Sequence, residues 1–191
     1  MYRIIVILAI FVSLGTAIQA QAIRIGSAVE SFRLPDTNGK SSSLNDLKGQ
    51  MGTVLIFVSA QCPVVKGYND RIREIAAEYG PKGFAFVGIN SNSTESIEWV
   101  RSNALENYDF PVLIDKGNVL ADKLGAAVTP EIFFIDSKSV LLYHGAIDND
   151  RSGRNPTEHY LRSALDSTLA GKKIERTSAN AFGCTIKRVG E

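Results

Sequence analysis

The chain has 191 residues, 21 Lys and Arg against 20 Asp and Glu, 45% hydrophobic residues and two cysteines, Cys62 and Cys184. This composition suits one globular domain with enough apolar residues for a core, and it excludes a disordered chain. Two cysteines cannot build a four-thiolate zinc site or a dense disulfide framework. A net charge of +1 gives no electrostatic footprint for nucleic acid, so that class of partner is not expected.

The first 22 residues have the order of a secretory signal peptide. Arg3 precedes an apolar run over 4–12, and small residues follow, with Ala20 and Ala22 each able to precede a cleavage site. An uncleaved anchor is the alternative, although about 20 apolar residues are normally needed to span a bilayer. We therefore expect a periplasmic or secreted protein with no stable membrane span after cleavage, in a compartment where disulfides persist.

Strands and helices alternate in the first half of the remaining chain. Residues 53–59 and 84–89 are continuous β-branched and aromatic runs, typical of strands buried on both faces. Between them, residues 63–79 carry apolar side chains at three- and four-residue steps, which predicts an amphipathic helix. A second helix is predicted to open after Asn92 or Ser93. This order of elements implies parallel strands.

The second half of the chain no longer alternates regularly between long strands and helices. A short strand is predicted at 112–114 and a helical turn at 119–124. Residues 131–136 and 140–144 are two apolar runs separated by a short polar turn, which predicts an antiparallel hairpin.

A final helix and a tail are predicted to complete the chain. Asn155 is the expected helix cap, with Pro156 at the first position and Glu158 three residues after the cap. From Gly171 onward the polar density rises and the periodicity fades, so we expect a tail that lies over the surface. The predicted organisation is a signal peptide over 1–22, one domain over 23–170 and a tail over 171–191 that carries Cys184.

Cys62 lies between the end of a buried strand and the first turn of a helix that begins with Pro63. Free backbone N–H groups and the helix dipole stabilise a thiolate at such a position, which favours a lowered cysteine pKa and a reactive sulfur. Lys66, one turn further on, can add positive potential, although its place on the polar helix face favours a solvated surface lysine. The alternative for Cys62 is a small buried hydrophobe.

The order of these elements resembles the thioredoxin-like superfamily: a buried strand, Cys62-Pro63 at a helix start, strand, helix, Thr129-Pro130, hairpin and terminal helix. Within it, the chain is most similar to exported redoxins of the alkyl hydroperoxide reductase and thiol-specific antioxidant group, which share a leader segment like residues 32–49. The resemblance implies an α/β, three-layer thioredoxin-like fold with a central mixed sheet, helices on both faces and a C-terminal antiparallel hairpin.

Two departures from the family pattern concern the chemistry. Dithiol oxidoreductases of the superfamily have two cysteines separated by two residues, and here Val65 stands at the second position, so no disulfide can form across one helical turn. Peroxiredoxins carry a proline seven residues and a threonine three residues before their cysteine, where this chain has Leu55 and Ser59. Ser59 can still offer its hydroxyl to a peroxide, and a hydroxyl bonded to the backbone is the alternative interpretation.

The resemblance also implies substrate-binding positions at Pro63, Thr129 and Pro130. In thioredoxin-like proteins the proline that matches Pro130 is cis and faces the reactive cysteine. The residue before it, here Thr129, then presents its backbone to an extended substrate. Glu131 follows, either as a proton acceptor near the site or as a charged residue at a strand edge.

Cys184 lies in the tail, far along the chain from Cys62, and Gly183 beside it allows the backbone to approach another segment closely. Three roles are open for Cys184. It can resolve an oxidised Cys62; it can form a permanent disulfide with Cys62, worth about 4–5 kcal/mol in the chain-entropy model; or it can be free or pair between chains. A copper site built from Cys62, Cys184 and His144 is a weaker hypothesis.

We therefore predict an exported thiol-disulfide oxidoreductase in which Cys62 attacks and Cys184 resolves the adduct, without metal or cofactor. The expected partners are a disulfide-bearing protein or a peroxide as substrate, and an unidentified thiol reductant. A peroxiredoxin-like thiol peroxidase is the first alternative. A non-catalytic binding module with a structural disulfide is the second.

Overall fold

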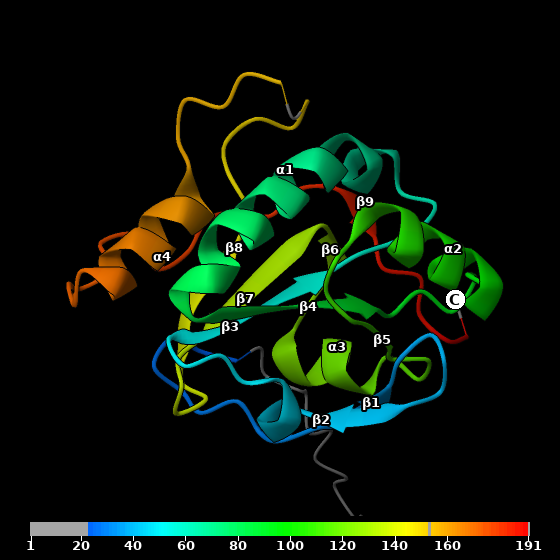
Figure 1. Ribbon diagram of the computed structural model, residues 1–191. Helices are drawn as coiled ribbons and strands as arrows, with labels where there is room; N and C mark the ends of the chain where they lie inside the picture. The colour runs from blue at the N-terminus through cyan, green and yellow to red at the C-terminus, as the bar shows by residue number, and fades with distance from the viewer. Residues whose placement is uncertain (1–22, 153, 191) are drawn as a thin grey trace, which may run out of the picture.

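The computed structural model describes residues 23–152 and 154–190, so the predicted signal peptide lies outside the described residues (Figure 1). The strands are β1 (Arg33–Pro35), β2 (Ser41–Ser43), β3 (Gly52–Phe57), β4 (Phe84–Asn90), β5 (Val112–Ile114), β6 (Val128–Thr129), β7 (Glu131–Ile135), β8 (Leu141–Gly145) and β9 (Cys184–Thr185). The helices are α1 (Pro63–Tyr79), α2 (Ile97–Asn107), α3 (Val119–Leu124) and α4 (Tyr160–Leu169), with 3-10 turns η1 (Leu44–Leu47) and η2 (Gly80–Lys82). No helix within these described residues is long and apolar enough to cross a membrane.

A five-stranded mixed sheet forms the centre of the molecule, in the order β5-β4-β3-β7-β8. Strands β3, β4 and β5 are parallel, whereas β7 runs antiparallel to β3 and pairs with β8 as an antiparallel hairpin. Every residue of β3 is buried, as expected for the central strand of a covered sheet. The predicted mixed sheet and hairpin are confirmed.

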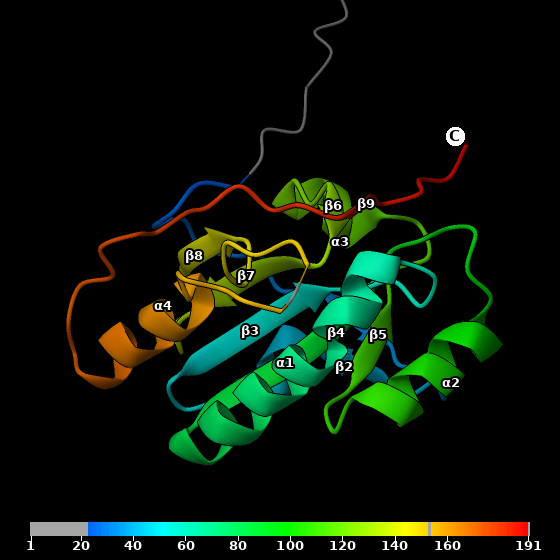
Figure 2. The same ribbon diagram turned by 90° about the horizontal axis from the view of Figure 1, so that it is seen from above.

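Helices cover both faces of the sheet (Figures 1 and 2). Neighbouring residues of β3 point to opposite sides, so the strand contributes to an apolar cluster on each face. Val54 and Ile56 belong to an apolar cluster with residues of α1, α2 and α4. Leu55 and Phe57 belong to a second cluster with residues of α3 and η1. The three-layer arrangement predicted for the chain is therefore confirmed.

Helix α2 begins later than predicted, at Ile97 with Ser96 as its N-cap. The residues before it have partners elsewhere in the molecule. The Asn92 side chain accepts a hydrogen bond from the backbone of Lys187, and the Glu95 carboxylate binds the loop before Cys62. Long-range hydrogen bonds thus hold these polar residues in a loop.

The predicted start of the last helix at Asn155 is wrong, since α4 begins at Tyr160 with His159 as N-cap. The Asn155 backbone N–H donates to the carboxylate of Asp150. Asn149 Oδ1 accepts from the next backbone N–H groups along this loop. These two side chains satisfy the N–H groups that a capping box would have used.

The C-terminal segment is built into the fold and does not simply lie over its surface. Thr177 and Ala179 exchange backbone hydrogen bonds with His144 of β8, and β9 then pairs antiparallel with β6. Ile186 is 1% exposed and belongs to the same cluster as α3. Figure 2 shows this segment, in red, crossing above β8 and β6. The predominantly polar tail therefore contributes two buried residues, Ile174 and Ile186, to the core.

The assignment of residues to the core predicts that two leucine-to-alanine substitutions lower the free energy of unfolding by different amounts. Leu55→Ala should lower the free energy of unfolding by about 2–5 kcal/mol, because it removes a fully buried side chain and leaves a cavity. Leu105→Ala is the matched control: Leu105 is 77% exposed, so the expected loss is below about 0.5 kcal/mol. Urea unfolding of the oxidised protein, followed by circular dichroism, measures both. Equal losses would contradict the assignment of Leu55 to the core.

Candidate active site

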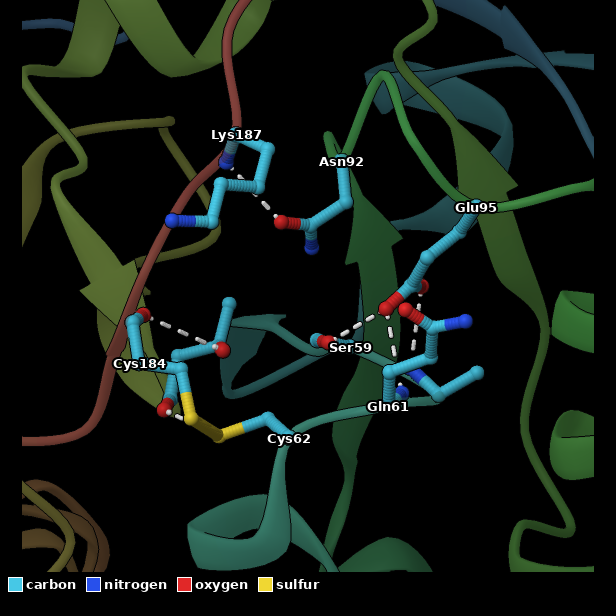
Figure 3. The surroundings of a disulfide bond; sticks show 9 residues. Ser59, Gln61, Cys62, Asn92, Glu95, Cys184 and Lys187 are labelled. Atoms are coloured by element: carbon cyan, nitrogen blue, oxygen red, sulfur yellow. Dashed lines mark hydrogen bonds between the residues drawn. A yellow bond between two sulfur atoms is a disulfide. The ribbon is translucent and has the colours of Figure 1, made fainter.

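A disulfide joins Cys62 to Cys184, two residues separated by 122 positions in the chain (Figure 3). Cys62 is the N-cap residue of α1 and Pro63 occupies the first helical turn, as predicted. Cys184 comes from β9, with its Cα 5.9 Å from that of Cys62. Cys62 is only 3% exposed, whereas Cys184 is partly exposed. Of the roles left open for Cys184, the resolving and structural ones fit this pairing, and a free thiol does not.

The disulfide lies against the Thr129-Pro130 peptide bond, which is cis as the resemblance implied. The carbonyl oxygen of Thr129 lies 3.3 Å from Cys62 Sγ. On β6, Thr129 stands opposite Cys184, and its hydroxyl donates to the Cys184 carbonyl at 3.4 Å. The C-terminal segment therefore occupies the backbone edge that Thr129 was expected to offer to a substrate.

Gly183 makes this approach possible. A Cβ atom at position 183 would lie 1.9 Å from the Thr129 carbonyl oxygen and 2.6 Å from its carbonyl carbon. Both atoms belong to the backbone beside the cis peptide bond, so they cannot turn aside as a flexible side chain would. The expectation that Gly183 permits a close backbone approach is confirmed.

Glu95 organises the loop that leads into Cys62. Its carboxylate accepts hydrogen bonds from the Ser59 hydroxyl at 2.5 Å and from the backbone N–H groups of Ala60 and Gln61, both at 3.0 Å. Asn90 Nδ2 donates to the same carboxylate at 2.6 Å. The Ser59 hydroxyl thus donates to a side chain, so the interpretation in which it bonds to the backbone is wrong. Sequence reasoning missed Glu95, because it lies in a distant loop that belongs to no motif.

Asn92 and Ser93 hold the other end of the C-terminal segment. Asn92 Oδ1 accepts from the Lys187 backbone N–H at 3.0 Å, and the Ser93 N–H donates to the Lys187 carbonyl at 2.9 Å. Asn92 is 8% exposed, and its Nδ2 has no partner among the described residues. In Figure 3 this nitrogen faces the space between Lys187 and Ser59. Two hydrogen bonds therefore hold the C-terminal segment to the loop before α2.

Glu131 stabilises the loop before the cis proline. It is 5% exposed, and its Oε2 accepts from the backbone N–H groups of Ala127 and Val128 at 2.7 and 3.1 Å. Its Oε1 lies 2.6 Å from His144 Nε2. Glu131 begins an interior strand of the sheet, and His144 contacts this carboxylate and not the cysteines. Both residues therefore support the fold of the loop behind Thr129.

Residues of helix α1 pack beneath the disulfide and against the C-terminal segment. Val65 is 1% exposed, so an aliphatic side chain occupies the position of a nearby second cysteine. The Tyr68 ring packs against Phe182, with centroids 6.3 Å apart, and its hydroxyl donates to Asp148 Oδ1 at 2.6 Å. Burial, and then the neighbouring Asp148 carboxylate, raise the pKa of Tyr68 well above its ordinary value, so it remains a neutral donor. Lys66 is exposed on the opposite side of the helix.

Comparison with known proteins identifies the family. Residues 25–144 match the model of the AhpC/TSA family, and because this match spans more than half of the chain, the protein belongs to that family. It is 27% identical over 144 residues to the thiol-disulfide oxidoreductase ResA of Bacillus cereus. The aligned region covers 71% of this chain and 81% of that protein.

Solved structures support the same fold. A hypothetical protein from Sinorhizobium meliloti 1021 superimposes with a TM-score of 0.81 at 32% identity, covering 91% of this chain and 99% of that one. A putative thiol:disulfide interchange protein DsbE from Chlorobium tepidum gives a TM-score of 0.65 at 19% identity, over 78% of this chain and 99% of that one, and shows the fold alone. The thioredoxin-like fold is confirmed, and family and disulfide together class the chain as a thiol-dependent oxidoreductase.

The contact between Gly183 and Thr129 predicts that Gly183→Ala weakens the disulfide. An added Cβ would clash with the backbone, so the equilibrium constant for disulfide formation in a glutathione buffer should fall at least about tenfold, or about 30 mV. Gly67→Ala is the matched control, because a Cβ there meets its nearest atom only at 3.9 Å. Thiol titration at defined glutathione ratios measures both constants. An unchanged constant for Gly183→Ala would show that the tail does not need this approach.

Proposed function

We propose that the protein carries out thiol-disulfide exchange, with Cys62 as the attacking and Cys184 as the resolving cysteine. One observation carries this proposal: the two cysteines of the chain meet at the start of α1, beside the cis Pro130. The helix start supplies free N–H groups and a positive dipole end, which stabilise the Cys62 thiolate when the disulfide opens. A purely structural bridge would not require that position.

Reduction begins at the more accessible side of the disulfide. Cys62 is buried and Cys184 is partly exposed, so the thiolate of a reductant attacks the Cys184 sulfur. The S–S bond breaks and Cys62 leaves as a thiolate, which its place at the helix start stabilises. A second reductant thiolate then attacks the reductant sulfur of this mixed disulfide, and Cys184 leaves as a thiolate. The reductant is oxidised to its disulfide, and the protein gains two electrons.

The substrate reaction then runs in the opposite sense. The Cys62 thiolate attacks one sulfur of a substrate disulfide, and the other substrate sulfur leaves as a thiolate. The Cys184 thiolate attacks the Cys62 sulfur of this mixed disulfide and releases the second substrate thiolate. The substrate has gained two electrons, and the Cys62–Cys184 disulfide has formed again. Cys184 thus performs from β9 the resolving step that Val65 cannot perform from α1.

Four other residues of the site have supporting roles in this proposal. Thr129 and cis Pro130 present a backbone edge to the substrate, and Pro63 begins the helix without requiring a hydrogen bond to its nitrogen. Glu95 holds Ala60 and Gln61 by their backbone N–H groups, and so acts as a positioning residue for the loop that carries Cys62. The exported location remains part of the proposal, supported by the leader sequence and by the persistence of disulfides outside the cytoplasm.

Disulfide exchange is preferred over peroxide reduction because of Ser59. Its hydroxyl, which a peroxidase site would direct at the peroxide, donates to the Glu95 carboxylate. The reacting partner of Cys62 in the structure is moreover a cysteine sulfur on an extended segment. Both observations favour a polypeptide disulfide as substrate.

Removal of the resolving cysteine should trap the reaction halfway. We expect Cys184→Ser to accumulate a stable adduct on Cys62 when it is mixed with a disulfide substrate, because no second sulfur is then available to attack it. Intact-mass spectrometry with peptide mapping identifies the adduct, and stopped-flow mixing with hydrogen peroxide compares the two oxidants. Cys62→Ser is the control and should form no such adduct. The scheme is wrong if Cys184→Ser forms neither a mixed disulfide nor a sulfenic acid at Cys62.

The reduction potential separates a catalytic bridge from a structural one. We expect the Cys62–Cys184 couple to lie above about −300 mV, since structural disulfides of secreted proteins lie below that value. Equilibration with defined ratios of reduced and oxidised dithiothreitol, followed by thiol alkylation and mass analysis, gives the potential. A value well below about −300 mV would favour the binding-module alternative, in which the bridge only ties the tail to the domain.

A further inference from the structure

We propose that the C-terminal segment Phe182–Lys187 occupies a groove that, in the reduced protein, receives an extended polypeptide with glycine directly before its reactive cysteine. The inference rests on the proposed function and names its substrate class. In the structure, Cys62 is bonded to a cysteine that arrives on an extended strand, opposite Thr129. Any polypeptide that forms a mixed disulfide with Cys62 must bring its sulfur to the same place.

Backbone pairing defines the direction of the incoming chain. The segment runs antiparallel to β6, with Val128 opposite Thr185 and Thr129 opposite Cys184. The Ile186 N–H donates to the Ala127 carbonyl at 2.9 Å, which extends the pairing beyond the cysteine. These bonds use main-chain atoms, so a foreign segment can form them whatever its sequence.

The glycine requirement comes from the residue before the cysteine. At that position an added Cβ would lie 1.9 Å from the Thr129 carbonyl oxygen, and Thr129 is itself 1% exposed and followed by the cis proline. The obstructing atoms belong to the main chain of a buried residue. A segment with any side chain before its cysteine therefore cannot reach the register that Gly183 and Cys184 adopt.

A second preference concerns the position two residues after the cysteine. Ile186 is 1% exposed and shares an apolar cluster with Leu120, Leu124 and Ala126, whereas Thr185 and Lys187 on either side of it are exposed. This alternation is that of a strand with one buried face. The groove therefore favours an aliphatic residue two positions after the substrate cysteine and tolerates most residues next to it.

The tail and the substrate cannot occupy the groove at the same time. Resolution of the mixed disulfide by Cys184 is therefore coupled to release of the substrate. Thr129 can pair with one strand at a time, so the substrate strand displaces the tail when the Cys62 thiolate attacks the substrate disulfide. When the tail returns, the Cys184 thiolate attacks the Cys62 sulfur, the Cys62–substrate bond breaks and the substrate cysteine leaves as a thiolate. The same movement that forms the internal disulfide removes the reduced product from its groove.

A peptide copied from the tail tests the groove. The peptide has the sequence of residues 181–188, and its cysteine carries 2-nitro-5-thiobenzoate as a mixed disulfide. Reduced full-length Cys184→Ser is mixed with it, so that the Cys62 thiolate attacks the peptide sulfur and the coloured thiolate leaves. Replacing the peptide glycine by alanine should slow the reaction at least about tenfold, because the clash must be overcome on the way to the mixed disulfide. Mass spectrometry confirms that Cys62 carries the peptide.

Matched controls separate the groove from general reactivity. Alanine in place of the peptide isoleucine should also slow the reaction, whereas alanine in place of the neighbouring lysine should not. The double variant Gly183→Ala, Cys184→Ser should react faster with the glycine peptide, because its own tail no longer fits the groove. Equal rates for the glycine and alanine peptides in both variants would overturn the groove while leaving exchange at Cys62 intact. No reaction with any peptide or with 5,5′-dithiobis(2-nitrobenzoate) alone would instead overturn the proposed function.

Discussion

The close contact between two main-chain segments, Gly183 and Thr129, determines the chemistry of this protein. The contact places Cys184 opposite Thr129 on β6, within bonding distance of Cys62. No other cysteine is available to Cys62, because the sequence has only two and Val65 fills the nearby position on α1 with a buried aliphatic side chain. The disulfide at the start of α1 therefore depends on a glycine from the far end of the chain, which has no side chain to prevent the approach.

Two carboxylates stabilise the loops on either side of the disulfide in the same way. Glu95 accepts the backbone N–H groups of the loop that leads into Cys62, and Glu131 accepts those of the loop that leads to the cis proline. In both loops a carboxylate therefore satisfies backbone N–H groups next to the disulfide. The C-terminal segment is the part of the site that would move in the proposed exchange reaction.

In the oxidised protein, the C-terminal segment itself covers the edge of β6 beside Cys62. Cys62 is buried, and the tail forms the main-chain pairing with β6 that the proposed extended substrate would form in its place. In the proposed mechanism, forming the Cys62–Cys184 disulfide therefore also closes the groove. In proteins with a local cysteine pair, the disulfide can close while the neighbouring surface stays open. Here the second cysteine closes the bond and covers the surface together, since it belongs to the covering strand.

The sequence by itself determined the order of the helices and of the five strands of the central sheet, the place of Cys62 at a helix start and the lack of a second cysteine in that turn. These are local properties, which follow from periodicity, from proline at the first helical turn and from residue identity over a few positions. The start of α2, the partner of the Ser59 hydroxyl, the role of Glu95 and the meeting of Cys62 with Cys184 were decided only by the tertiary structure. Each depends on hydrogen bonds or backbone contacts between segments far apart in the chain. Local sequence patterns do not predict such contacts, because the contacting segments come together only when the chain has folded.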